Sequence, residues 1–156
     1  PRSKVGLVWA GNTTYQNDFR RSIPFELISK ILNVPGFQFY SLQIDRLETA
    51  TAAINDGMLV DIGTGFSDFS DTASVISQLD LVISVDTAVV HLAGALGIPV
   101  WNLLPRASDW RWLLNRSDSP WYPTMRLFRQ PSPGDWKSVI EEVKTALLKF
   151  ERSGTH

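Results

Sequence analysis

The sequence has no cysteine and only two histidines, His91 and His156. The missing thiols exclude disulfide bonds, thiolate metal centres and a cysteine nucleophile, and two histidines are too few for a histidine-rich zinc site. No apolar stretch approaches the roughly 20 residues that span a bilayer, and the chain does not open with a signal peptide. The sequence therefore predicts a protein with no membrane span.

Basic residues are unevenly spread. The 15 Lys and Arg residues are balanced by 16 Asp and Glu residues, so the formal charge of −1 provides no basic field that would hold nucleic acid. Residues 47–105 contain seven acidic side chains and no Lys or Arg. An anion-binding side chain must therefore come from the region of Arg20 and Arg21 or from beyond Leu104, and backbone amides must supply the rest.

Length and composition fit one globular domain. The 156 residues are 44% hydrophobic and 20% charged, which is enough apolar material for a proper core. The first residue is Pro1 rather than an initiator Met, which indicates a piece of a longer protein. We treat residues 1–156 as one domain.

Short apolar runs alternate with amphipathic segments along the chain. The runs predict strands at residues 4–10, 37–42, 58–62, 81–85, 98–104 and near 126–128. The segments between them predict helices from about 22 to 34, at 47–55 and 70–79, from Asp86 or Thr87 to about 96, and from 136 to about 151. This order predicts an α/β fold: a doubly wound, Rossmann-like, mostly parallel sheet of about six strands. Ligands of such folds bind beyond the carboxyl ends of the strands.

The segment 84–97 places polar side chains at one of those strand ends. Asp86 or Thr87 would begin a helix, and its free amides could hold a diphosphate or another anion together with the Thr87 hydroxyl. Asp86 would repel an anion that it faced, so we expect it to cap the helix or to orient a hydroxyl. His91 lies one turn into the helix. The alternative interpretation is a pair of capping residues and a packed histidine.

The loop after the first strand is a second candidate. Gly11 permits close approach of the backbone to a ligand, and Arg20, Arg21 and the hydroxyl of Ser22 could meet a phosphate at the start of the next helix. The alternative is a solvated loop with surface arginines. The loop has neither G-x-G-x-x-G nor a P-loop motif, which disfavours a dehydrogenase or an NTPase. Gln43, just past the second strand, could read a base or ribose edge or could simply be solvated.

Tryptophans concentrate in the second half of the chain, at positions 101, 110, 112, 121 and 136. Beside Arg106, Arg111 and Arg116 they would form an aromatic surface for a sugar, a base or a neighbouring domain. The alternative is that they pack a long loop onto the sheet.

Several separated motifs resemble one family. The C-terminal region of bacterial tetratricopeptide-repeat glycosyltransferases is similar at residues 5–12 (VGLVWAGN), 21–24 (RSIP), 39–43 (FYSLQ), 86–97 (DTAVVHLAGALG), 109–112 (DWRW) and 119–124 (SPWYPT). The Asp-Thr-Ala-x-x-His portion also resembles the heptosyltransferases of glycosyltransferase family 9. The resemblance covers nearly the whole chain.

The resemblance implies the C-terminal, donor-binding half of a GT-B glycosyltransferase, an inverting enzyme that moves a sugar from a nucleoside diphosphate to a hydroxyl. It implies donor contacts at Asp86, Thr87, Ala88 and His91, a phosphate contact at Arg21, and a looser match of Gln43 to the nucleoside. It also implies a cytoplasmic protein that needs no metal or cofactor. An N-terminal GT-B domain and tetratricopeptide repeats of the same longer chain would be its partners.

Two other functions stay open. The chain could be a non-catalytic nucleotide- or sugar-binding module in a repeat scaffold, or half of a nucleotide-sugar epimerase. No residue of the sequence can be assigned as the catalytic base, because the half of the cleft that would bind the acceptor is absent from the chain.

Overall fold

A six-stranded parallel sheet forms the centre of the molecule. The structure, a computed structural model, describes residues 2–11, 22–44, 47–106 and 123–153. The strands are β1 (Ser3–Val8), β2 (Phe37–Ser41), β3 (Leu59–Asp61), β4 (Leu81–Val85), β5 (Val100–Leu104) and β6 (Met125–Arg129). They lie in the order β3-β2-β1-β4-β5-β6, with every neighbouring pair parallel. This confirms the predicted α/β Rossmann-like sheet.

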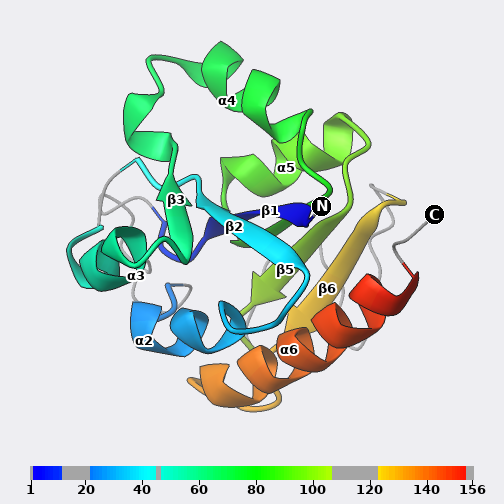
Figure 1. Ribbon diagram of the computed structural model, residues 1–156. Helices are drawn as coiled ribbons and strands as arrows, with labels where there is room; N and C mark the ends of the chain where they lie inside the picture. Colours follow the sequence, from blue (N-terminus) through cyan, green and yellow to red (C-terminus); the bar gives the residue numbers. More distant parts are fainter. Residues whose placement is uncertain (1, 12–21, 45–46, 107–122, 154–156) are drawn as a thin grey trace.

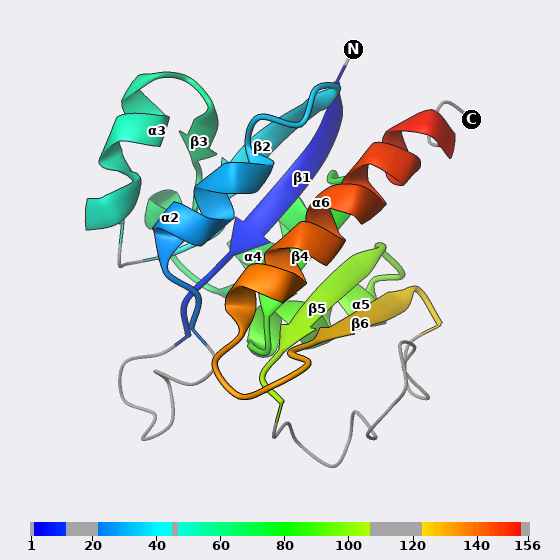
Figure 2. The same cartoon turned by 90° about the horizontal axis from the view of Figure 1, so that it is seen from below.

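Helices cover both faces of the sheet, as the crossovers between parallel strands require. The helices are α2 (Phe25–Ile28), α3 (Thr51–Asn55), α4 (Phe69–Ile76), α5 (Ala88–Ala95) and α6 (Trp136–Ser153), and the short 3-10 turns are η1 (Ser29–Ile31), η2 (Glu48–Ala50) and η3 (Gly63–Gly65). Helices α2 and α6 lie on one side of the sheet, and α4 and α5 on the other (Figure 1). In the view turned by 90°, α6 lies over the sheet and runs nearly alongside β1 and β5 (Figure 2).

Helix boundaries differ from the sequence prediction more than strand boundaries do. The helix expected from residue 22 begins only at Phe25, because Pro24 takes the N-cap position with extended backbone, and it tightens into η1 after one turn. The helix expected at 47–55 is divided into η2 and α3. Helix α4 begins at Phe69 with Asp68 as its cap, rather than at residue 70.

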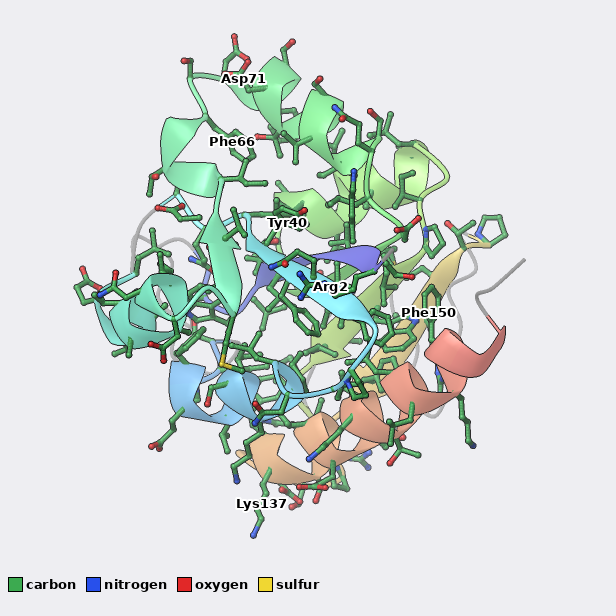
Figure 3. The ribbon with its side chains drawn as sticks, in the orientation of Figure 1. Arg2, Tyr40, Phe66, Asp71, Lys137 and Phe150 are labelled. Carbon is green, nitrogen blue, oxygen red and sulfur yellow. The ribbon has the colours of Figure 1, made fainter. Side chains whose placement is uncertain are left out.

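The alternation of side chains along the strands separates the sheet into two faces. Trp101 of β5 packs on Phe128 of β6 and on Phe150 of α6, with ring centroids 5.3 and 5.9 Å apart. In Figure 3 Phe150 points from α6 toward the sheet, whereas Tyr40 of β2 lies on the side of α4 and α5. Asn102, which follows Trp101, therefore belongs to the face that α5 covers.

Three of the six tryptophans belong to the core. Trp9, Trp101 and Trp136 are all at most 7% exposed, so packing, not an exposed aromatic surface, accounts for them. Trp110, Trp112 and Trp121 lie outside the described residues, as do Arg111 and Arg116.

In the described part of the chain, no helix is long and apolar enough to cross a bilayer.

Candidate functional site

The chain reverses its direction of travel across the sheet between β1 and β4. From β1 it moves outward to β2 and β3, then returns to place β4 on the other side of β1 and continues to β5 and β6. At such a switch point the turns after the two central strands diverge and leave a crevice at the carboxyl edge of the sheet. The turn after β1 carries Gly11, and the turn after β4 carries Asp86, Thr87 and Ala88. Two of the predicted clusters therefore meet at one edge.

Gln43 fixes the backbone at the exit of β1. Its side-chain oxygen accepts hydrogen bonds from the amides of Trp9 and Ala10, at 2.8 and 2.9 Å. The residue is only 3% exposed, so the solvated alternative does not hold. Gln43 lies at the predicted site, and its amide oxygen is used to position the turn that leads to Gly11.

The turn at η3 supports Gln43 from the other side. A Cβ atom on Gly63 would lie 2.2 Å from the carbonyl oxygen of Gln43 and 2.5 Å from the carbonyl carbon of Leu42. Only glycine permits this approach of two backbones. The short turn at residues 63–65 thus fixes the end of β2, which the sequence alone did not show.

Gly11 is buried beside the beginning of α2. Its amide donates to the hydroxyl of Ser22 at 3.2 Å, which joins the two ends of the loop between β1 and α2. The body of that loop, including Arg20 and Arg21, lies outside the described residues. The predicted phosphate contact of Arg21 therefore stays a prediction.

Thr87 is the N-cap residue of α5, but its side chain does not cap the helix. The Thr87 hydroxyl lies 3.2 Å from the hydroxyl of Ser84 instead. Among the described residues no hydrogen bond is made by the amides of Ala88 and Val89, which belong to the first turn of α5. The helix therefore presents uncapped donors and the positive end of its dipole at the crevice.

Helix α4 shows the usual arrangement for comparison. Its N-cap Asp68 accepts from the amide of Asp71 at 3.1 Å, and the Asp71 carboxylate accepts from the amide of Ser67 at 2.7 Å. The first turn of α4 is thus closed by the protein's own side chains. The first turn of α5 has no such bond from the side chain of its N-cap residue.

His91 lies one turn into α5 and is half-buried. Residues four apart on a helix share a face, so His91 lies below Thr87 on the same side of α5. This placement is consistent with both interpretations of His91, the ligand contact and the packed histidine.

Two arginines, Arg106 and Arg129, lie at the carboxyl edge farther along the sheet. Burial and then the neighbouring positive charge of Arg106 lower the pKa of Arg129 from its usual value. Gln130 holds the turns that carry them, because its side-chain oxygen accepts from the amides of Arg106 and Gly134 at 3.0 and 3.1 Å. Arg129 and Gln130 were missed in the sequence, although the charge distribution placed the available cations beyond Leu104.

A cavity of about 980 Å³ lies between α2 and α3 and reaches Trp9 and Ala10. Its polar rim includes the carboxylates of Glu26, Glu48 and Asp56, and no Lys or Arg is among its described lining residues. These carboxylates would repel a diphosphate, so the cavity between α2 and α3 does not suit that ligand. Nowhere in the described part of the chain do three or more acidic or histidine side chains form a group that could hold a metal ion.

Comparison with known proteins shows which of them resemble this chain. The model of glycosyltransferase family 9 (heptosyltransferase) matches residues 46–113, which include the turn after β4 and all of α5. The curated protein FlbA of Caulobacter vibrioides is 34% identical over 158 residues, which is 98% of this chain and 26% of that protein.

Solved heptosyltransferases have the same fold. The E. coli heptosyltransferase WaaC with ADP superposes with a TM-score of 0.69 at 17% identity, over 95% of this chain and 44% of that one. The E. coli ADP-heptose LPS heptosyltransferase II gives 0.67 at 16% identity, over 96% of this chain and 48% of that one. The chain thus spans about a quarter of the curated relative and less than half of these structures. The chain is therefore similar to glycosyltransferase family 9 (heptosyltransferase) over residues 46–113 and has the Rossmann-like fold of the solved heptosyltransferases.

Proposed function

We propose that the chain is the donor-binding domain of an inverting glycosyltransferase, which moves a sugar from a nucleoside diphosphate to a hydroxyl acceptor. The observation that carries the proposal is the uncapped first turn of α5 at the switch point, in a chain whose fold matches a heptosyltransferase solved with ADP. The proposal includes a cytoplasmic protein and two partners in the same longer chain: an N-terminal GT-B half and tetratricopeptide repeats.

The charge distribution supports an anionic ligand at α5. Departure of the donor's diphosphate concentrates negative charge on its oxygens, and uncapped amides aimed at those oxygens stabilise that charge without a metal. Arg106 and Arg129 add positive charge along the same edge. The acceptor and the catalytic base belong, in this proposal, to the N-terminal half.

The first test measures binding to the 156-residue chain by calorimetry in EDTA. We expect ADP and inorganic pyrophosphate to bind and adenosine to bind more weakly. Binding that requires added Mg²⁺ would contradict the metal-free site. Sugar transfer by residues 1–156 alone would contradict the division of the cleft, because positioning both reactants needs both halves.

His91 provides the matched test. A charge-assisted hydrogen bond to a diphosphate is worth about 1.5–3 kcal/mol, so His91→Ala should weaken ADP binding about tenfold or more and leave adenosine binding nearly unchanged. Gln78→Ala is the control, since Gln78 lies exposed past the far end of α4 and bonds only its own helix. A lower melting temperature with an unchanged ratio of the two affinities would assign His91 to packing.

A further inference from the structure

Two polar side chains are completely buried beneath the start of α5. Ser84 of β4 and Asn102 of β5 are partners in the parallel register, and both are 0% exposed. Neither the oxygen nor the nitrogen of the Asn102 amide has a hydrogen-bond partner. An unpaired buried amide is unfavourable for folding, so its retention in an otherwise apolar strand needs a reason.

The single proton of the Ser84 hydroxyl determines which of its two hydrogen bonds it donates and which it accepts. The Ser84 hydroxyl lies 2.6 Å from the carbonyl oxygen of Val85, and a carbonyl oxygen only accepts. A hydroxyl has a single proton, so Ser84 donates it to Val85 and must accept from Thr87 at 3.2 Å. The Thr87 proton therefore points inward, away from the crevice.

This arrangement restrains Thr87 in the free protein. Turning the Thr87 hydroxyl toward an anion would remove the donor from the buried oxygen of Ser84, which would then lack one of its partners. Asn102 is the register partner of Ser84 on the adjacent strand. Neighbouring strands lie about 4.8 Å apart, and the register sets the Asn102 amide beside Ser84 on the face that α5 covers.

We propose that Asn102 is a positioning residue that exchanges with Thr87 as the hydrogen-bond donor to Ser84. In the free chain Thr87 donates to Ser84 and the amide of Asn102 is unpaired. With a diphosphate bound, Thr87 donates outward to a phosphate oxygen, and the nitrogen of Asn102 donates to Ser84 in its place. This inference rests on the proposed function, because the anion at α5 is what draws the Thr87 proton outward.

The test is Asn102→Leu, which replaces the amide by an apolar side chain of similar size. Two effects of opposite sign are expected. The free chain should melt about 2–4 °C higher, since an unpaired buried polar group is removed. Binding of pyrophosphate and ADP should weaken about fivefold, with adenosine unchanged, because Thr87 can no longer turn outward without leaving Ser84 short of a donor. A purely structural role for Asn102 would leave the ratio of ADP to adenosine affinity unchanged.

A second background shows whether Asn102 acts through Thr87. With Thr87→Val already present, Asn102→Leu should cause no further loss of pyrophosphate affinity. The control is Thr72→Val, which removes a buried hydroxyl of α4 on the same face and should not change the affinity ratio. If Asn102→Leu does not fold, Asn102→Ala tests the same ratio.

Two outcomes would overturn the inference, and they are distinguishable from failure of the proposed function. The inference alone fails if the parent chain binds pyrophosphate and Asn102→Leu binds it equally well. It also fails alone if the loss persists undiminished in the Thr87→Val background. If the parent chain binds neither pyrophosphate nor ADP, the proposed function fails and this inference fails with it.

Discussion

Replacing Gln43 by Met should destabilise the fold more than a typical single substitution does. The Gln43 side chain accepts from two buried amides, those of Trp9 and Ala10. Met keeps the length and the packing of the side chain but offers them no comparable acceptor. Each amide left unpaired costs about 1–3 kcal/mol, so we expect Gln43→Met to lower the free energy of unfolding by about 2–6 kcal/mol. Domains of this kind are stable by about 5–15 kcal/mol, so the variant should still fold.

The assay is urea denaturation, with Gln38→Met as the matched control. Gln38 lies half-buried in β2, the strand that ends two residues before Gln43, and its bond to the carbonyl oxygen of Phe39 is long, at 3.4 Å. Its replacement should change the free energy of unfolding by less than about 0.5 kcal/mol. A loss at Gln43 below about 1 kcal/mol would show that water or a local shift satisfies the two amides. The claim that Gln43 positions the turn before Gly11 would then be wrong.

Two further predictions test other parts of the molecule. Gly63→Ala should reduce the free energy of unfolding by about 1–3 kcal/mol, because the added Cβ atom would lie 2.2 Å from the carbonyl oxygen of Gln43. If the variant melts at the same temperature as the parent chain, the two backbones do not approach this closely. Asp135 is the second case: bonds from the hydroxyl and amide of Ser138 hold its pKa below the usual value. Its ionised form therefore stabilises the fold above about pH 4, and this contribution is lost as the pH falls through the lowered pKa. The stability difference between the parent chain and Asp135→Asn should shrink in acid, and a difference that is constant with pH would contradict this assignment.

The sheet could be predicted from the sequence because its strands are buried on both faces. The run at residues 81–85 is apolar apart from one serine, and β4 has these same bounds. Each helix between such runs must cross over the sheet, which determines the parallel arrangement. The helix ends could not be predicted as well. The change from α2 to the 3-10 turn at Ser29–Ile31 depends on how the segment packs against α6, and periodicity does not report this.

The place of the candidate residues in the fold could be predicted, but their hydrogen bonds could not. The motif at residues 86–91 and the turn at Gly11 lie at the carboxyl edge of the sheet, as the sequence predicted. The role of Gln43 depends on amides 33 and 34 residues away in the chain, so no local pattern reveals it. One signal was visible and was not used: Asn102 and Ser84 are single polar residues within apolar strands. Buried polar residues in such strands need partners, and this expectation could have drawn attention to them.

The first turns of α4 and α5 differ in a way that favours an anion at α5. Both helices have eight residues and follow a turn that contains an aspartate. In α4 the protein closes the first turn with Asp68, an arrangement worth about 1 kcal/mol of stability. In α5 the available hydroxyl, that of Thr87, is drawn to Ser84, and this stabilisation is absent. The difference lies at the switch point, in a segment where residues 47–105 have no basic side chain. Open amides are the means by which this segment can attract an anion, and closing them with Thr87 would remove that attraction.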